Sequence, residues 1–74
     1  MEKGKVWNHI RKFRFNHGEM TQQNLADRLG VSRQTVIAIE SGKYSPSLEL
    51  AFRIAAIFQS ELSDVFYYDP PDDL

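Results

Sequence analysis

The segment from Thr21 to Gly42 constrains the fold most, because its pattern indicates two short helices joined by a tight turn. Thr21 and Ser32 are each placed to cap a helix start, since their side-chain oxygens accept a free backbone N–H. Gly30 and Gly42 stand where such helices end, in the left-handed conformation that glycine tolerates. The small Ala26 lies where two helix backbones would cross. This spacing predicts a helix-turn-helix, a motif whose second helix lies in the major groove of DNA.

Hydrophobic periodicity predicts three further helices along the chain. One runs from about Lys5 to Asn16, one follows the Ser47 cap to about Phe58, and a short one spans about 62–66. No segment shows the alternation of a strand, so the predicted class is all-α, a compact five-helix bundle. The side chains expected to face its core are Val6, Ile10, Phe13, Leu25, Ala26, Leu29, Val36, Ile39, Leu48, Ala51, Ile54, Ala55 and Phe58.

Length and composition favour one small domain. With 74 residues there is room for a single core, which we assign to a helix-turn-helix domain at 1–66 followed by an acidic C-terminal tail at 67–74. The chain has no cysteine, which excludes disulfides and thiolate metal sites. Its longest apolar run, 54–58, is too short to span a bilayer, and its N-terminus lacks the apolar stretch of a signal peptide. We therefore expect a cytoplasmic protein without a membrane partner.

The charge is unevenly distributed although the net charge is only −1. Residues 1–44 hold eight basic and four acidic residues, a balance of +4, whereas residues 45–74 hold one basic and six acidic residues, a balance of −5. Such an asymmetry suggests a basic face toward a polyanion and an acidic end that points away or toward a protein.

The residues from about 10 to 66 resemble the Cro/repressor-like (Xre-type) helix-turn-helix family. The resemblance is carried by residues 21–23, 25–26, 29–36, 39–42 and 46–51. It implies a lambda-repressor-like five-helix bundle whose members bind operator DNA as dimers. The chain departs from the family pattern by an additional residue within 17–20, and by Gln59-Ser60 where glycine and an aliphatic residue are often found.

The predicted reading helix, 33–41, presents its N-terminal side chains to base edges. With Val36 taken as the inward direction, Gln34 and Ala38 point away from the core, and Arg33 and Thr35 stand at the helix start. Arg33 can donate two hydrogen bonds to guanine, and Gln34 can pair with adenine. We expect these two to supply most of the readout, with Thr35, Ile37 and Ala38 in secondary roles. The alternative is a solvated surface face.

Phosphate contacts are expected at helix starts, where free N–H groups and the helix dipole favour anions. Gln22 follows the Thr21 cap, and Ser32 caps the reading helix. Lys43 and Tyr44 lie in the loop after that helix and fit the same role by resemblance. The alternative for Lys43 is an ordinary loop lysine.

Glu40 points toward the core in the same helical arithmetic, where an unpaired carboxylate is costly. Arg14 in the first helix is the expected partner, and the family resemblance implies the same ion pair. The alternative is that both side chains are exposed and separate.

Catalytic and metal sites are not expected. His9 and His17 are the only histidines, and no nucleophile elbow or phosphate-cradling glycine loop is present. We therefore predict that the chain is not an enzyme and uses no cofactor.

Aromatic residues are more numerous than a core of this size needs. We expect most to be buried, with Trp7 and the stretch 66–68 left over. These either cover the bundle ends or form a self-association surface.

The predicted function is a sequence-specific transcriptional regulator, a repressor or autoregulator, that binds a pseudo-palindromic operator as a homodimer through 47–58, 62–66 and the C-terminal aromatics. The alternative is a protein-interaction module, such as an antitoxin or an RNA polymerase adaptor.

Overall fold

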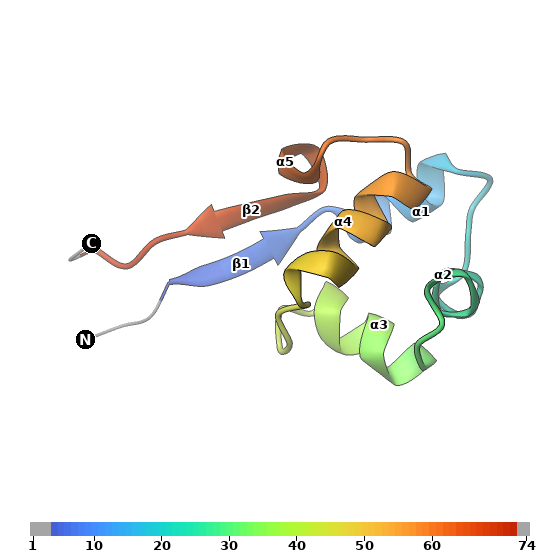
Figure 1. Cartoon of the computed structure of the whole chain (residues 1–74), viewed down its shortest axis with the longest axis horizontal. Coiled ribbons are helices and arrows are strands. Elements are labelled where there is room, and N and C mark those ends of the chain that lie inside the picture. The colour runs from blue at the N-terminus through green and yellow to red at the C-terminus, as the bar shows by residue number, and fades with distance from the viewer. Residues whose placement is uncertain (1–3, 73–74) are drawn as a thin grey trace.

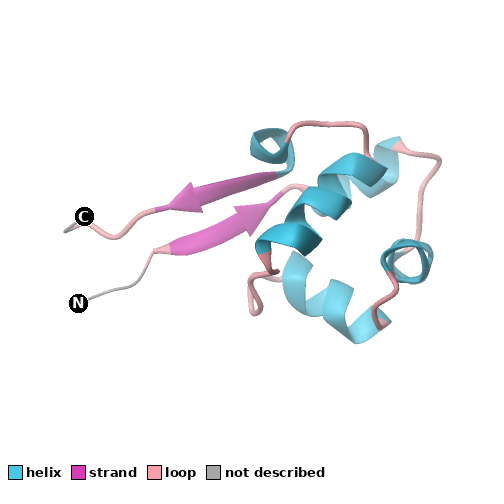
Figure 2. Ribbon diagram, in the orientation of Figure 1, coloured by secondary structure: helices cyan, strands magenta, loops and turns pink. Residues whose placement is uncertain are grey.

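Five short helices and a two-stranded antiparallel ribbon make up the computed structural model, which describes residues 4–72 (Figure 1). The five-helix prediction is confirmed within this range. Figure 2 shows the helices gathered in one body, from which the two strands extend to one side. In chain order the elements are β1 (Lys5–Asn8), α1 (Ile10–Asn16), α2 (Gln22–Leu29), α3 (Arg33–Glu40), α4 (Leu48–Ile57), α5 (Leu62–Val65) and β2 (Phe66–Asp69).

Side-chain caps begin three of the helices, as predicted. The Oγ1 atom of Thr21 accepts the N–H of Asn24 at 3.0 Å, and the Oγ atom of Ser32 accepts the N–H of Thr35 at 3.1 Å. Ser47 caps α4 in the same way. Because each cap satisfies a backbone donor that has no partner inside its helix, the positions of these helix starts are determined locally.

The core confirms the predicted inner stripes of α2, α3 and most of α4. Leu48 was expected in the core but is 66% exposed. Hydrophobic periodicity shows which face of a helix is apolar, but it does not show how much of that face other elements cover. Most aromatic residues were expected in the core, yet Phe15 and Phe52 are exposed. Phe66 was expected to be left over but is buried, because β2 turns its side chain onto the core. The buried residues are Ile10, Met20, Leu25, Ala26, Leu29, Val36, Ile39, Ala51, Ile54, Ala55, Phe58, Val65 and Phe66.

The first helix begins later than predicted, because Lys5–Asn8 form a strand. This strand pairs with β2 in an antiparallel register that sets Val6 opposite Tyr68 and Trp7 opposite Tyr67. Branched and aromatic residues favour this pairing, and Val6 and Phe66 pack against the core. The all-α prediction is thus corrected by a small sheet, here called the β-ribbon. Residues 67–69, assigned to the tail, belong to β2.

Asn8 is the last residue of β1, and its side chain marks the change from strand to helix. Its Oδ1 atom accepts the N–H of Ile10 at 3.1 Å, and its Nδ2 atom donates to the carbonyl oxygen of Ile39 at 2.8 Å. An asparagine that bonds nearby backbone competes with helix continuation and favours a helix start. The same side chain therefore sets the boundary and ties the β-ribbon to the last turn of α3.

The two departures from the family pattern coincide with left-handed residues. Glu19 has a φ of 55° in the turn between α1 and α2, and Gln59 has a φ of 53° after α4. The N–H of Ser60 bonds the carbonyl oxygen of Ala55 at 3.0 Å, as in a glycine-ended helix. The last turn is therefore formed without glycine, with Gln59 in the conformation that glycine usually adopts.

Two glycines with similar backbone angles test the contact between the β-ribbon and the loop after α3. A Cβ on Gly30 (φ 73°) would meet no atom within 4 Å, whereas a Cβ on Gly42 (φ 78°) would lie 3.1 Å from Trp7 Cζ3. We expect Gly30→Ala to lower the free energy of unfolding by about 1–2 kcal/mol through left-handed strain alone. Gly42→Ala should lower the free energy of unfolding by roughly 1 kcal/mol more than Gly30→Ala does, because its new methyl group is also overpacked. Urea denaturation measures both, and equal losses would contradict the contact.

Candidate nucleic-acid interface

The turn between α2 and α3 fixes how these two helices cross. The N–H of Gly30 bonds the carbonyl oxygen of Asp27 at 3.3 Å, and the N–H of Val31 bonds that of Ala26 at 3.1 Å. This pattern closes α2 around a left-handed glycine. Ala26 is fully buried at the crossing. The local sequence therefore sets the angle at which α3 leaves the turn.

Burial of one face of α3 leaves its N-terminal side chains outward. Val36 and Ile39 are each 1% exposed and hold the helix on the core. Arg33 and Gln34 are exposed at the helix start, as the helical arithmetic predicted. These two side chains can therefore reach a ligand that lies along α3.

The three residues predicted to have secondary roles are less accessible than Arg33 and Gln34, and Ile37 is one of them, being half-buried. Thr35 is half-buried, and its Oγ1 atom lies 3.0 Å from the Oγ atom of Ser32 in a shared hydrogen bond. Ala38 is also half-buried, one turn further along α3. The side chains of Thr35 and Ala38 are short, so they extend less far from α3 than those of Arg33 and Gln34.

The predicted phosphate-contact residues fall into two groups. Gln22 and Ser32 stand at the starts of α2 and α3, where the first N–H groups have no partner inside the helix. The amide of Gln22 is engaged within the protein, since its Nε2 atom donates to Glu40 Oε1 at 3.3 Å. Lys43 and Tyr44 are both exposed after α3, and their N–H groups bond the carbonyl oxygen of Ala38.

A surface depression joins the starts of α2 and α3. Arg33 of α3 and Arg11 of α1 both line it, although the sequence could not distinguish Arg11 from ordinary solubilising charges. The sequence feature that could have identified Arg11 is its position three residues before Arg14, since this spacing places both side chains on one face of α1. The lining residues are Arg11, Arg14, Thr21, Gln22, Gln23, Arg33 and Glu40.

Arg14 and Glu40 form a two-point ion pair between α1 and α3. Arg14 Nε donates to Glu40 Oε2 at 2.6 Å, and Nη2 donates to Oε1 at 3.1 Å. Nη1 donates to the carbonyl oxygen of Met20 at 2.8 Å. The two side chains are only 13% and 10% exposed. Together with Gln22, this ion pair links α1, α2 and α3 directly beneath the depression.

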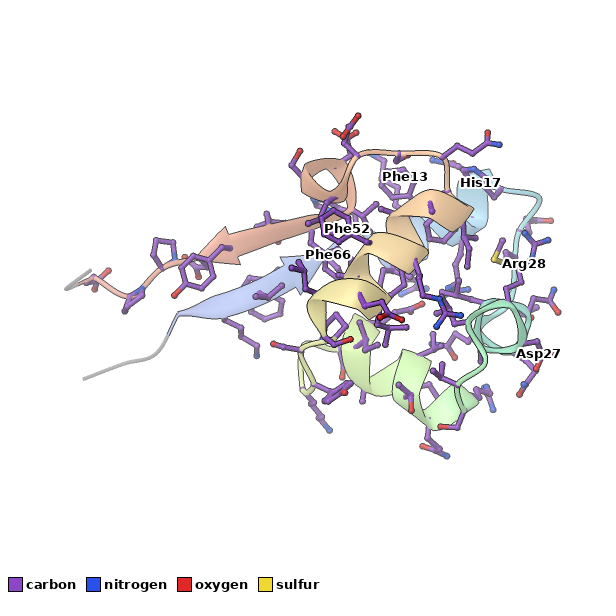
Figure 3. All side chains as sticks on the ribbon, viewed as in Figure 1. Phe13, His17, Asp27, Arg28, Phe52 and Phe66 are labelled. Atoms are coloured by element: carbon purple, nitrogen blue, oxygen red, sulfur yellow. The ribbon has the colours of Figure 1, made fainter. Side chains whose placement is uncertain are left out.

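The histidines pack against aromatic rings. His17 contacts Phe58 edge to face with ring centroids 5.2 Å apart, close to Phe13 as Figure 3 shows. His9 stacks on Tyr67 with ring centroids 5.0 Å apart.

Among residues 4–72, no three histidine, aspartate or glutamate side chains gather in a way that could hold a metal ion. Over the same range, the helices lack the length and apolarity needed to cross a membrane.

Known proteins resemble the chain across this unit. Residues 10–65 match the model of a helix-turn-helix family. An uncharacterized HTH-type transcriptional regulator of Methanocaldococcus jannaschii is 53% identical over 62 residues, which cover 84% of this chain and 92% of the relative. Another such regulator, from Archaeoglobus fulgidus, is 48% identical over 60 residues, which cover 81% and 84%.

Solved structures share the fold. The transcriptional regulator VanUg superimposes with a TM-score of 0.71 at 17% identity, over 96% of this chain and 93% of that one. A hypothetical transcription factor from Neisseria, NHTF, gives 0.70 at 28% identity, over 86% and 70%. The family match, the close relatives and the α2–turn–α3 geometry agree: the chain belongs to the helix-turn-helix family of the Cro/repressor (Xre) type.

Proposed function

We propose that the chain is a sequence-specific DNA-binding regulator of transcription, a repressor or autoregulator, that reads the major groove with residues 33–41. The observation that carries this proposal is the pair of exposed side chains, Arg33 and Gln34, at the start of a helix whose opposite face is buried. The names of the relatives, which are HTH-type transcriptional regulators, support it.

The readout is divided by reach and chemistry. Arg33 donates two hydrogen bonds to guanine O6 and N7, and Gln34 makes the paired contact with adenine. Ala38 rests against a thymine methyl group, and Thr35 contributes only when its hydroxyl leaves Ser32. Arg33 and Gln34 thus supply most of the discrimination between operators.

Backbone phosphates bind at both ends of this unit. At one end the free N–H groups after Thr21, at Gln22, face the anion, while Ser32 presents the start of α3. At the other end Lys43 and Tyr44 contact the neighbouring phosphates from the loop after α3. These contacts position α3 without reading sequence.

The active species is a homodimer on a pseudo-palindromic operator, with half-sites about 34 Å apart. A single module buries only about 600–1,000 Å² on DNA, which limits its affinity. Exposed Leu48 and Phe52 lie one turn apart on α4, and Tyr67 and Tyr68 are exposed on β2. Figure 3 places Phe52 on the side of α4 from which the β-ribbon leaves. We assign these apolar side chains, with α5, to the dimer surface.

A charge on this surface should dissociate the dimer. We expect Phe52→Asp to be monomeric at concentrations where the wild type sediments as a dimer, because association would bury the new carboxylate. Phe15→Asp is the matched control, since Phe15 is similarly exposed but lies on α1. Sedimentation velocity measures both. A wild-type monomer, or a dimer that survives Phe52→Asp, would contradict the assignment.

Selection from a randomised duplex pool tests DNA reading directly. Recovery of a two-fold symmetric motif, with affinity that falls steeply between about 50 and 200 mM salt, is the expected result. Retention of DNA without an enriched sequence would remove base reading from the proposal. Absence of binding even at low salt would instead favour a protein-interaction module such as an antitoxin or RNA polymerase adaptor, for which exposed Phe15 offers an apolar contact.

A further inference from the structure

The N-terminal strand lies against the loop that follows α3. A Cβ on Gly42 would be 3.0 Å from Lys5 Cε, 3.1 Å from Trp7 Cζ3 and 3.4 Å from Lys5 Nζ. The first strand of the β-ribbon and the start of this loop are therefore in contact, although Gly42 lies 37 positions after Lys5 in the sequence. This contact brings Lys5 close to the segment that contains Lys43 and Tyr44.

The indole of Trp7 holds the Lys5 side chain in place. The Lys5 ammonium lies 4.3 Å from the centroid of the Trp7 ring, a cation–π distance. Such a contact orients an ammonium but leaves its charge unneutralised. Asp69 stands opposite Lys5 in the register of the β-ribbon, yet the ammonium is turned toward the indole and Gly42. Lys5 is therefore an oriented and exposed cation.

This cation stands at the far end of the reading helix. The eight residues of α3 span about 12 Å, which is close to the width of the major groove. When the start of α3 contacts base edges, its other end and the following loop come near a backbone strand. The side chains of Lys5 and Lys43 are both exposed, so each ammonium is open to an anion that approaches this end of α3.

We propose that Lys5 of β1 is a DNA-phosphate contact, which together with Lys43 and Tyr44 forms a phosphate-binding corner outside the helix-turn-helix. This inference rests on the proposed function. This phosphate-binding corner gives the β-ribbon a role in DNA binding. The pairing of β1 with β2 positions the Lys5 ammonium beside the DNA backbone that runs past the end of α3. The ligand is a backbone phosphodiester, and recognition is independent of sequence.

The salt dependence of DNA affinity reports the number of phosphate contacts, and it therefore tests the phosphate-binding corner. We expect Lys5→Gln to reduce the slope of log K against log salt by about 0.9 on a mixed-sequence duplex. Between about 50 and 200 mM salt, the wild type should then lose roughly 3.5-fold more affinity than the variant. Lys5→Arg, which keeps the charge, should retain the wild-type slope. Fluorescence anisotropy with a labelled duplex measures all of these.

Lys12→Gln is the matched control. Lys12 is exposed and lies two residues before Arg14, so its side chain leaves α1 about 160° away from that of Arg14. The same charge is removed, but we expect the salt slope to stay at the wild-type value. An equal reduction in both variants would mean that only net charge matters, which would overturn the proposal.

The one tryptophan of the chain supplies a second readout. A phosphate that arrives at Lys5 changes the charge balance over the Trp7 ring, so the emission of Trp7 should change as unlabelled duplex is added. No change during proven binding would overturn the corner. So would a Lys5→Gln variant with a lower thermal midpoint and an unchanged salt slope, because Lys5 would then only stabilise the end of α3.

The two proposals fail in distinguishable ways. Binding of the mixed duplex with the expected slopes, but without an enriched motif in the selection, would remove sequence-specific reading and leave the phosphate-binding corner supported. An enriched motif with an unchanged Lys5→Gln slope would remove the corner and leave the proposed function supported. No binding by the wild-type protein at low salt would overturn both.

Discussion

The double variant Arg33→Ala, Gln34→Ala should bind the selected operator roughly 30- to 10⁴-fold more weakly than the wild type. Each good bidentate base contact contributes about 1–3 kcal/mol of discrimination, and two are removed. Both side chains are exposed, and Val36 and Ile39, which hold α3 on the core, are untouched. The thermal midpoint should therefore remain close to that of the wild type. Anisotropy titrations with the operator and with a scrambled duplex give the specificity ratio.

The scrambled duplex separates reading from charge. Loss of Arg33 removes one cation, so a modest weakening on scrambled DNA is expected, while the larger loss is confined to the operator. Arg28→Ala is the control, since it removes an exposed arginine from the last turn of α2. If operator and scrambled DNA weakened equally, Arg33 and Gln34 would be part of a charged surface and would not read bases.

Glu40→Ala should lower the thermal midpoint by roughly 10–20 °C. The variant leaves the Arg14 guanidinium, whose side chain is 13% exposed, with the Met20 carbonyl oxygen as its remaining partner. Removing one member of a fully buried pair costs about 3–5 kcal/mol, and the residual access of water to Arg14 reduces this to about 2–3 kcal/mol. In a domain of this size each kcal/mol shifts the midpoint by about 4–8 °C. Differential scanning calorimetry measures the change.

Two further variants assign that loss to the ion pair. Glu49→Ala removes an exposed glutamate from the first turn of α4 and should cost less than about 1 kcal/mol. Replacing both Arg14 and Glu40 by methionine should recover much of the stability, because no charge is then left unpaired. A Glu40→Ala midpoint within a degree or two of that of the wild type would show that the pair does not stabilise the fold.

Much of the helical framework could be predicted because it depends on residues four or fewer positions apart. The caps at Thr21 and Ser32 and the left-handed turns at Gly30 and Gly42 are hydrogen-bonding and steric properties of short segments. The exposure of Arg33 and Gln34 follows from the 100° advance per residue once Val36 is known to face inward.

The β-ribbon could not be predicted in the same way. Val6, Ile10 and Phe13 have helical spacing, and branched or aromatic residues such as Val6 also suit a strand, so the local pattern permits either state. Pairing with Tyr67 and Tyr68, about sixty residues further along, decides between them. The exposure of Leu48 and Phe52 has a similar origin, since a helix has an apolar face whether or not another element covers it.

The sequence by itself therefore determined where the helices of the reading unit begin, where they end and which side of α3 faces outward. Tertiary structure alone decided that Arg11 and Arg33 line one depression and that Lys5 reaches Gly42 at the other end of α3. The physical reason is the range of the interactions. Caps and turns are satisfied within one segment, whereas a contact between distant segments exists only after packing has brought them together.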